Sequence, residues 1–594
     1  MRVADYIFKK FYSIGIEKAY IVTGRGALFL TDALAAKNDQ ISAVSMHHEQ
    51  SAGFAAGAES QLTNSPSLCL VSTGCASTNC ITPVLNAWQD GLPVIFLSGQ
   101  NFLKETTYFT GQNLRTFGQQ EANIVSIVKS ITNYSKMIAC ADEVPQVIEE
   151  AIHAANFGRK GPVWIDIPLD IQNSRISEEN ALDSPKIIGH KEESHRPSLK
   201  KLIKDLKVSK RPVILIGSGV RHSDSIQSLG SFLELNQIPL VYSSSSVDIY
   251  PSGNKLSIGS VGSMGCSREG AFTIQNADLI LVLGNRLPSI LTGPDYCKFG
   301  REAKIHVVDI DEAEHKKNGI RIDNFIKTDL ASFFNSMPNK KLTPELSLWH
   351  KKVFHWKRLF RKYVNFESDN KIDLYNLADI LSNKMKNDSI LITDSGFNEV
   401  ILPTNINFSP RRRAIHPVSQ GSMGFAIPAI IGVHQKNESQ EIICVVGDGS
   451  IMMNLQELQT ISHHKINVKI IVINNDIYSI IRRRQKELFR NRTIGTGIDD
   501  GVSIPDFKQL SKTFKLNYFK CTRARDLEDS LDHFLSKDGP SLLEIYGRHD
   551  QQYIEISRTK NKDRKIVRRP LEDQWPFLER DIFLSEMIID VIDQ

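Results

Sequence analysis

Short apolar runs alternate with longer amphipathic stretches along almost the whole chain. In two places the same pattern recurs: an apolar run leads through glycine and a helix-like stretch to a second run, from Leu68 to Val94 and from Ile442 to Val468, and both separations are 26 residues. Apolar runs of this kind predict buried strands, and their alternation with helices predicts parallel sheets covered by helices. We therefore predict an α/β fold with three doubly wound parallel-sheet domains, two of them built on one plan.

Two polar segments with little apolar periodicity divide the chain. They cover residues 174–198 and the region around residues 337–343, and such segments are typical of linkers. The predicted domains are an N-terminal domain at 1–173, a middle domain at 197–336 and a C-terminal domain at 370–548. The tail, 549–594, is charged and interrupted by prolines, so we expect an arm or lid there.

Composition narrows the class of protein. The chain has 594 residues, of which 41% are hydrophobic, and this is enough for several full cores. The net charge of +5 is small for this length, which argues against a nucleic acid as the main partner. Local basic clusters remain compatible with this balance.

No targeting or membrane segment is expected from the sequence. The N-terminus, MRVADYIFKKFYSIG, carries Asp5 and lysines inside its apolar pattern, which predicts an amphipathic helix and not a signal peptide. The apolar runs are too short for a membrane span. The eight cysteines form no C-x-x-C pair, so we expect a reduced, cytoplasmic protein without a zinc site.

A candidate cation and phosphate site lies in the C-terminal domain. One apolar run ends on GDGS (447–450) and the next ends on Asn474 and Asn475. On neighbouring parallel strands these endings bring a carboxylate and an amide together, and Mg²⁺ prefers oxygen ligands that include those of a bound phosphate. The glycines permit close backbone approach, and the new helix directs N–H groups at an anion. The alternative is an ordinary β-α-β unit with a tight turn.

The distance between the two parts of this motif makes it specific. Twenty-four residues separate Gly449 from Asn474, and the segment resembles the signature of thiamine-diphosphate (ThDP) enzymes, GDG followed at this distance by NN. The resemblance implies that Mg²⁺ is bound by the Asp448 and Asn475 side chains and the Ile477 carbonyl. It also implies diphosphate contacts from Gly447, Gly449 and Ser450.

A second candidate residue, Glu49, lies in the N-terminal domain. It follows a strand-like run and leads a helix of small residues in HHEQSAGFAAGAES. This segment resembles the acetolactate synthase (acetohydroxyacid synthase) large subunits, in which the glutamate of HEQ bonds to the cofactor's aminopyrimidine and promotes loss of the thiazolium proton. The alternative is a glutamate that only interacts favourably with the helix dipole.

The resemblance covers nearly the whole chain. FGQQEANIV (117–125) places Gln120 where the family has a glutamine in the reaction pocket, with Gln119 in place of an apolar side chain. HPVSQGSMGFAIPAIIG (416–432) places Met423 beneath the bent cofactor. The alternatives are solvated loop glutamines and a methionine that fills the core.

The middle domain carries strand-like runs that end in Gly, Arg or Asp, as a sheet that binds a nucleotide at its strand ends requires. No complete G-x-G-x-x-G is present. These runs, with GRKGPVWIDIP (158–168), resemble the flavin-binding acetolactate synthases, and the resemblance implies a structural FAD; family members without flavin are the alternative. The implied FAD residues are Arg159, Gly217, Gly219, Gly262, Arg286 and Asp309.

The family reaction is decarboxylation of pyruvate followed by transfer of the two-carbon unit to an acceptor carbonyl. The segment from Ile477 to Gln485 contains no carboxylate, which favours carboligation over simple decarboxylation. This segment and the tail resemble flavin-containing carboligases of bacterial polysaccharide pathways, of the kind that make the branched sugar yersiniose. That likeness implies a nucleotide-activated 4-keto-deoxysugar as acceptor, with the diphosphate near basic side chains at Arg482, Arg483, Arg484, Arg568 and Arg569.

Alternatives to this function and an expected oligomer complete the interpretation. The basic side chains are equally compatible with a solvated helix face, and the alternative function is an acetolactate synthase catalytic subunit that uses a second 2-keto acid. A non-enzymatic paralogue is a third reading, against which Glu49, Asp448 and Asn475 argue. The family geometry implies a homodimer or homotetramer, with Glu49 and the GDG loop meeting across the subunit interface.

Overall fold

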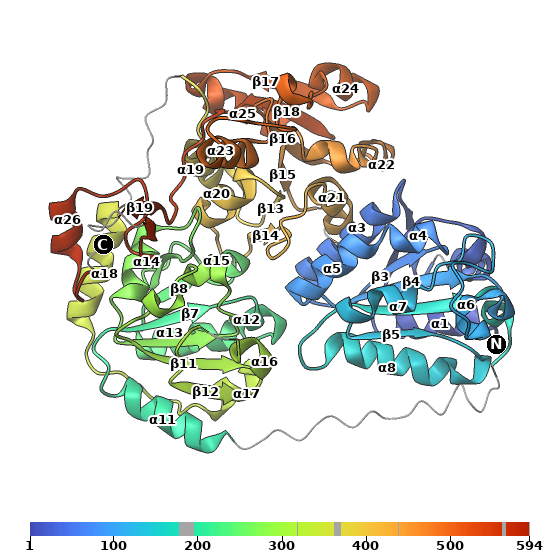
Figure 1. The fold of residues 1–594 in the computed structure, drawn as a ribbon, viewed down its shortest axis with the longest axis horizontal. Coiled ribbons are helices and arrows are strands. Elements are labelled where there is room, and N and C mark those ends of the chain that lie inside the picture. Colours follow the sequence, from blue (N-terminus) through green and yellow to red (C-terminus); the bar gives the residue numbers. More distant parts are fainter. Residues whose placement is uncertain are drawn as a thin grey trace.

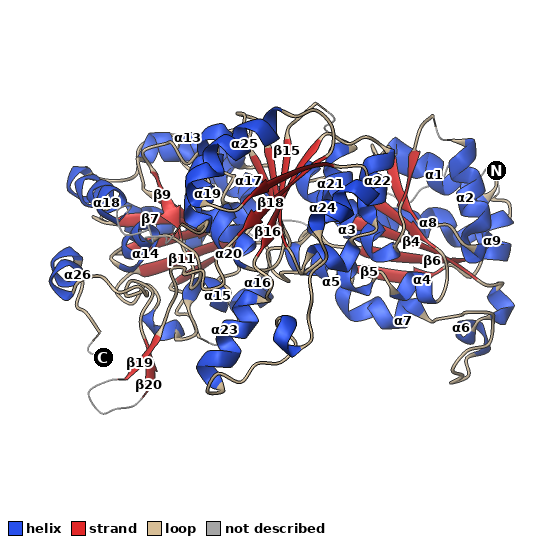
Figure 2. Ribbon diagram, turned by 90° about the horizontal axis from the view of Figure 1, so that it is seen from above, coloured by secondary structure: helices blue, strands red, loops and turns tan. Residues whose placement is uncertain are grey.

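The computed structural model describes most of the chain. The described residues are 1–37, 39–176, 195–317, 319–360, 370–436, 439–560 and 566–592. Most of the linker predicted at residues 174–198 therefore lies outside the described residues. Three α/β units are arranged around a common centre (Figure 1), with parallel sheets inside and helices outside (Figure 2).

The N-terminal unit is a six-stranded parallel sheet in the order β2-β1-β3-β4-β6-β5. Side chains alternate along each strand, so Leu68 and Leu70 of β3 face one core while Cys69 and Val71 face another. Both faces of the sheet are therefore covered, as predicted. Its strands are β1 (Lys18–Ile21), β2 (Ser42–Ser45), β3 (Ser67–Val71), β4 (Val94–Gln100), β5 (Tyr134–Met137) and β6 (Val163–Pro168), and its main helices are α1 (Val3–Ser13), α2 (Leu28–Ala36), α3 (Glu49–Thr63), α5 (Ile81–Asp90) and α8 (Val144–Asn156).

The C-terminal unit has the same topology, with the order β14-β13-β15-β16-β18-β17. The repeat expected from the spacing of the apolar runs is thus confirmed, because β3 and β4 correspond in position to β15 and β16. Its strands are β13 (Ile390–Thr393), β14 (Arg413–Ile415), β15 (Ile442–Gly447), β16 (Val468–Asn474), β17 (Asn517–Cys521) and β18 (Ser541–Tyr546), and its helices include α19 (Leu374–Lys384), α20 (Phe397–Asn405), α21 (Ala426–His434), α22 (Glu457–His463), α23 (Ser479–Leu488), α24 (Phe507–Thr513) and α25 (Leu527–Ser536).

The middle unit is a parallel sheet in the order β12-β11-β10-β7-β8-β9. The strand order reverses between β7 and β10, and a crevice for a nucleotide forms at such a switch point. Its strands are β7 (Pro212–Ile216), β8 (Leu240–Tyr242), β9 (Ser257–Ser260), β10 (Leu279–Leu283), β11 (Lys304–Asp309) and β12 (Asn324–Lys327), and its helices include α11 (Arg196–Leu206), α13 (Ile226–Asn236), α14 (Arg268–Gln275) and α17 (Leu330–Ser336).

Two segments outside the three predicted domains pack on the middle unit. Helix α18 (Ser347–Phe360) buries Trp349 and Trp356 in the same core as β7 and β10. The tail forms an antiparallel pair, β19 (Arg558–Lys560) with β20 (Ile566–Arg568), and then α26 (Arg580–Glu586). Its Phe583 joins that core, so the described tail docks on the middle unit.

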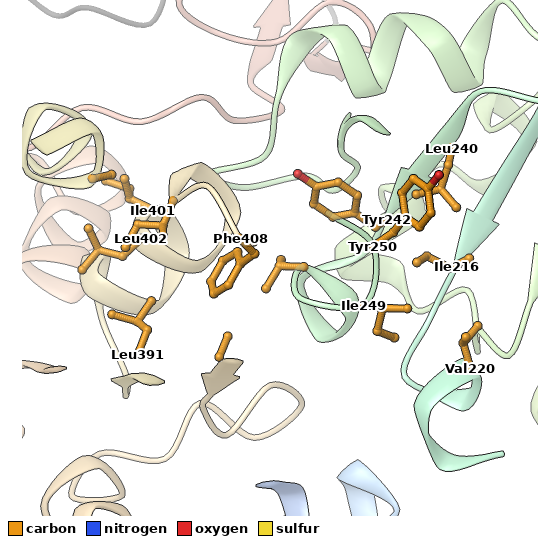
Figure 3. Close-up of a cluster of buried hydrophobic side chains, with 14 of the residues drawn as sticks. Ile216, Val220, Leu240, Tyr242, Ile249, Tyr250, Leu391, Ile401, Leu402 and Phe408 are labelled. Carbon is orange, nitrogen blue, oxygen red and sulfur yellow. The ribbon is translucent and has the colours of Figure 1, made fainter. Parts of the chain in front are cut away.

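Two apolar cores cross the boundaries between units. One contains Ile249 and Tyr250 of the middle unit beside Leu402 and Phe408 of the C-terminal unit (Figure 3). The other joins α3 to α21, which pack so closely that a Cβ on Gly432 would lie 2.1 Å from the carbonyl oxygen of Ala55. In the described part of the chain, no helix is both long and apolar enough to cross a membrane.

Candidate active site

The GDG loop and the NN pair meet at the carboxyl edge of the C-terminal sheet. β15 and β16 pair in parallel with Gly447 opposite Ile473. One oxygen of the buried Asp448 carboxylate accepts the backbone N–H groups of Asn475 at 2.8 Å and Asp476 at 2.7 Å, and the other accepts that of Gly449 at 2.7 Å. Burial raises the pKa of Asp448 to about 6, although these three N–H groups oppose the rise.

The neighbouring amide is held in a similarly defined orientation. Asn475 Nδ2 donates to Ser479 Oγ at 2.6 Å, and its Oδ1, which accepts the Ile477 N–H at 3.4 Å, keeps a lone pair for a cation. Gly449 has no room for a side chain, because a Cβ there would lie 1.9 Å from the Tyr478 ring. A carboxylate, an amide oxygen and the nearby Ile477 carbonyl are a donor set that suits Mg²⁺ and not a soft metal.

Ser450 connects this loop to the segment that carries Met423. Its hydroxyl donates to Asp394 Oδ2 at 2.7 Å and accepts the N–H of Gly424 at 3.0 Å. Met423 is half-buried next to Gly424. The structure therefore places the predicted Met423 segment against the predicted diphosphate loop.

Asn454 brings the start of α3 to the same place. Its Nδ2 donates to Gly424 O at 2.8 Å and to Gln50 Oε1 at 3.0 Å, while its Oδ1 accepts the Ser51 hydroxyl at 3.0 Å. Glu49 itself is the first residue of α3, and its carboxylate accepts Asn79 Nδ2 at 2.9 Å. Within the chain, the helix start thus contacts the turn after the GDG loop through Gln50 and Ser51.

Gln119 and Gln120 lie on an exposed loop of the N-terminal unit. The Gln119 side chain accepts a hydrogen bond from Arg25, and Gln120 has a positive φ of 57°. Gly74 lies directly beneath it, since a Cβ there would be 1.8 Å from the carbonyl oxygen of Gln120. The two glutamines therefore lie beside the segment STGCASTN (72–79), which contains both Gly74 and Asn79.

A cavity of about 510 Å³ lies at the switch point of the middle sheet, where the three units meet. All six residues proposed from the sequence for FAD line it: Arg159, Gly217, Gly219, Gly262, Arg286 and Asp309. Glycine is required at 217 and 219, because a Cβ at either would lie within 2.8 Å of the backbone of Gly284 or Asn285. Such close backbone approach is typical of nucleotide sites.

Charged side chains of this cavity lining pair with one another. Arg159 contacts Asp311 at 2.8 Å and Glu314 at 2.6 Å, and Arg286 lies 3.7 Å from Glu314. Residues of the C-terminal unit, among them Ser419, also line the cavity. Here Arg286 donates to Ser419 Oγ at 2.7 Å, and the Ser419 N–H donates to Asp90 at 3.0 Å.

Four of the five arginines proposed to meet a nucleotide sugar contact carboxylates of the chain. Arg482 contacts Asp500 at 2.9 Å, and both Arg483 and Arg484 contact Glu555 of the tail. Arg569 contacts Asp573 at 3.2 Å. These contacts tie the tail to α23 and neutralise most of the charge that the sequence suggested for a diphosphate.

Sequence reasoning missed Asp394, Asn454 and the C-terminal wall of the cavity. Asp394 follows β13, and burial raises its pKa to about 7. The signal was available, because TDSG (393–396) ends a strand in the same way as GDGS does. Asn454 and His416 had no such signal, since their importance rests on contacts with distant parts of the chain.

Comparison with known proteins agrees with this geometry. Family models match the N-terminal TPP binding domain of thiamine pyrophosphate enzymes at residues 1–127, their central domain at 199–337 and their C-terminal TPP binding domain at 394–545. The acetolactate synthase isozyme 1 large subunit of Escherichia coli is 28% identical, over 91% of this chain and 93% of the relative. The Lactococcus lactis large subunit is 27% identical over 91% and 92%, and the chloroplastic enzyme of Arabidopsis thaliana is 25% identical over 93% and 82%.

The fold and the site define a thiamine-diphosphate-dependent enzyme. The chain belongs to the thiamine pyrophosphate enzyme family, with its N-terminal, central and C-terminal domains in that order, and its homologues include acetolactate synthase large subunits.

Proposed function

We propose that the protein is a Mg²⁺- and ThDP-dependent carboligase that decarboxylates pyruvate and transfers the two-carbon unit to an acceptor carbonyl. The observation that carries this proposal is the convergence of Asp448, Asn475 and the Ser450–Gly424 contact at one sheet edge. When bound, ThDP supplies a nucleophilic carbon and an electron sink for the loss of CO₂.

The chain's residues would position these reactants. The oxygens of Asp448, Asn475 and Ile477 would hold Mg²⁺, and Gly447, Gly449 and Ser450 would lie against the diphosphate. Met423 would contact the cofactor, while Glu49 would hold a proton at the pyrimidine ring and Gln120 would line the reaction pocket. The segment from Ile477 to Gln485 contributes no acid, which agrees with attack on an acceptor in place of protonation.

The better supported acceptor is a second 2-keto acid. The relatives compared above are acetolactate synthases, and they align with about nine-tenths of this chain. In addition, carboxylates of the chain contact Arg482, Arg483 and Arg484. A CDP- or dTDP-4-keto-deoxysugar is the second candidate, favoured by the tail, which departs from the acetolactate synthase pattern.

The test separates the two acceptors. The protein is incubated with ThDP, Mg²⁺, FAD and pyruvate, alone, with 2-ketobutyrate, and with the nucleotide keto-sugar. We expect acetolactate from pyruvate alone and acetohydroxybutyrate with 2-ketobutyrate. A sugar adduct without acetolactate would reverse the acceptor assignment. Formation of acetaldehyde and CO₂ as the only products would contradict carboligation.

We also infer that the cavity of the middle unit holds FAD in a structural role. Support comes from its position at the switch point and from the glycines at 217 and 219. Flavin bands in the visible spectrum of the purified protein, or of protein incubated with FAD and then desalted, test this. A protein that retains no flavin after incubation would contradict it.

We infer, finally, that the active unit is at least a dimer in which Glu49 of one copy serves the GDG loop of another. Met452 and Met453, directly after this loop, expose 41% and 49% of their surface, and exposed apolar residues of this kind fit an interface. Co-expression of Glu49→Gln and Asp448→Ala subunits tests it. If the site is shared between subunits, about a quarter of the sites in the mixture are intact, and activity returns to about a quarter of the wild-type level. If each site lies within one chain, the mixture stays inactive.

A further inference from the structure

Four loops meet at the carboxyl edge of the N-terminal sheet. The neighbouring strands β2, β1, β3 and β4 are followed, in that order, by Glu49, Arg25, Ser72 and Asn101. The carboxyl ends of parallel strands share one edge of a sheet, and ligands of α/β proteins bind outside that edge. Arg25 therefore follows the strand next to the one that leads to Glu49, on the edge where the cofactor is proposed to react.

The turn that carries Arg25 is fixed on both sides. A Cβ on Gly24 would lie 2.5 Å from the Ser72 Cβ, so this turn packs directly on the end of β3. The N–H of Gly26 donates to Ser72 Oγ at 3.0 Å, and its carbonyl oxygen accepts the buried Gln172 Nε2 at 2.6 Å. The backbone thus presents Arg25 at a defined point of the edge.

The guanidinium is oriented by a neutral partner. Arg25 Nη1 donates to the side-chain oxygen of Gln119. The Gln119 carbonyl oxygen in turn accepts Asn101 Nδ2 at 2.9 Å, which ties its loop to the end of β4. Both Arg25 and Gln119 are exposed. An amide oxygen orients the guanidinium without neutralising its charge.

This positive charge is available to an anion. Arg25 forms no ion pair with any residue that the structure describes, whereas four of the five arginines considered for a nucleotide sugar are held by carboxylates. Its planar fork of N–H donors suits carboxylate or phosphate oxygens. Because Gln120, proposed for the reaction pocket, directly follows Gln119, the charge lies beside that pocket.

The chemistry of the proposed reaction assigns this charge to the acceptor and not to the donor. Pyruvate loses its carboxylate in the first half of the reaction. A fixed cation that stabilised this carboxylate would stabilise the ground state more than the transition state for loss of CO₂ and would slow that step. The acceptor, in contrast, keeps its anionic group throughout, so a cation that binds this group assists the second half without a penalty.

We propose that Arg25 binds the anionic group of the acceptor and makes the enzyme selective for anionic acceptors. Gln119 is a positioning residue that holds the guanidinium. The inference rests on the proposed carboligase function and deepens it. The anionic group is the carboxylate of a 2-keto acid or the diphosphate of a nucleotide keto-sugar, since both offer the paired oxygens that a guanidinium binds.

A competition experiment tests this selectivity. The protein with ThDP, Mg²⁺ and FAD receives pyruvate and an equimolar mixture of 2-ketobutyrate and propanal, its neutral counterpart without the carboxylate. The ratio of acetohydroxybutyrate to hydroxypentanone reports the relative kcat/KM of the two acceptors. This ratio does not depend on how much protein folds or how fast pyruvate is decarboxylated, so a merely structural role would not change it.

We expect Arg25→Gln to lower this ratio by about tenfold, because a charge-assisted contact is lost. Arg25→Lys keeps the charge and should retain most of the selectivity. Gln119→Glu gives the guanidinium a carboxylate partner and should lower the ratio as Arg25→Gln does. Arg411→Gln is the control and should leave it unchanged, since the exposed Arg411 precedes β14 at the amino edge of the C-terminal sheet.

A second mixture, of the nucleotide keto-sugar and propanal, separates the two sources of the anion. The acceptor whose ratio to propanal falls in Arg25→Gln is the one that Arg25 binds. Unchanged ratios in both mixtures would overturn the proposal while leaving the carboligase function intact. A wild type that forms no ligated product with any acceptor would contradict the carboligase function itself, and the role of Arg25 with it.

Discussion

The backbone N–H of Asn475 donates to the Asp448 carboxylate at 2.8 Å, so the GDG loop and the NN pair orient each other before any cation is bound. Asp448→Ala removes a predicted Mg²⁺ ligand and leaves three backbone N–H groups without their acceptor. We expect at least about a tenfold loss of Mg²⁺-dependent ThDP affinity, measured by isothermal titration. Asp476→Asn, the exposed neighbour, is the control and should bind normally.

Glu49→Gln tests the proposed proton position. The amide keeps an oxygen for the hydrogen bond from Asn79, so the fold and ThDP affinity should change little. Turnover of pyruvate should fall by about 10² to 10⁴, because the side chain no longer accepts a proton. Initial rates of pyruvate consumption measure this, and unchanged turnover would remove Glu49 from the mechanism.

Gly432→Ala tests the packing of α3 on α21. The added Cβ would lie 2.1 Å from the carbonyl oxygen of Ala55, so one helix must move away from the other. We expect a loss of about 1–3 kcal/mol in stability, seen as a lower denaturant midpoint. Gly230→Ala is the matched control in helix α13: a Cβ there has nothing within 4 Å, and alanine should be neutral or stabilising.

Glu59→Gln tests the cost of a buried carboxylate. Burial raises the pKa of Glu59 from 4.5 to about 6, while the hydrogen bond from the Tyr20 hydroxyl at 2.6 Å opposes the rise. The folded state therefore holds this proton more tightly than the unfolded chain, and the wild-type stability falls as the pH rises from about 4.5 to above 6.

The glutamine variant cannot lose that proton, and its amide can still bond to Tyr20. Relative to wild type it should gain about 2 kcal/mol at pH 8, and the difference should shrink below pH 4.5. Urea unfolding at both pH values measures this. A variant that is less stable at pH 8 would show that the contact with Lys436, 3.7 Å away, outweighs the cost of burial.

Local sequence was enough for the parts of the site that lie on adjacent strands. Gly449 follows one strand, Asn474 ends the next, and one helical connection joins the two strands. In a parallel β-α-β unit the carboxyl ends of the two strands lie side by side. The same argument applies to Gly217 and Asp309, each at the end of a strand of one sheet. These residues could be placed by counting runs and turns.

Contacts between units could not be predicted from local sequence in this way. Asn454 bonds to Gln50 across 404 positions, and Arg413 meets Asp248 across 165. The arginines of α23 looked free in the sequence, yet Glu555 of the tail binds two of them. No periodicity in a single chain specifies which distant carboxylate will lie beside a given arginine.

The sequence by itself determined the three α/β units and the position of each motif at a strand end, because these depend on hydrophobic periodicity and short-range spacing. The ThDP class came from the resemblance of the GDG and NN motifs to a known family signature. Tertiary structure alone decided that α3 reaches the turn after the GDG loop, that Asp394 is buried beside Ser450, and that His416 faces Glu399 in a cavity shared by three units. Those features arise from the packing of whole sheets and helices against one another, and the free energy of that packing is spread over many residues far apart in the chain.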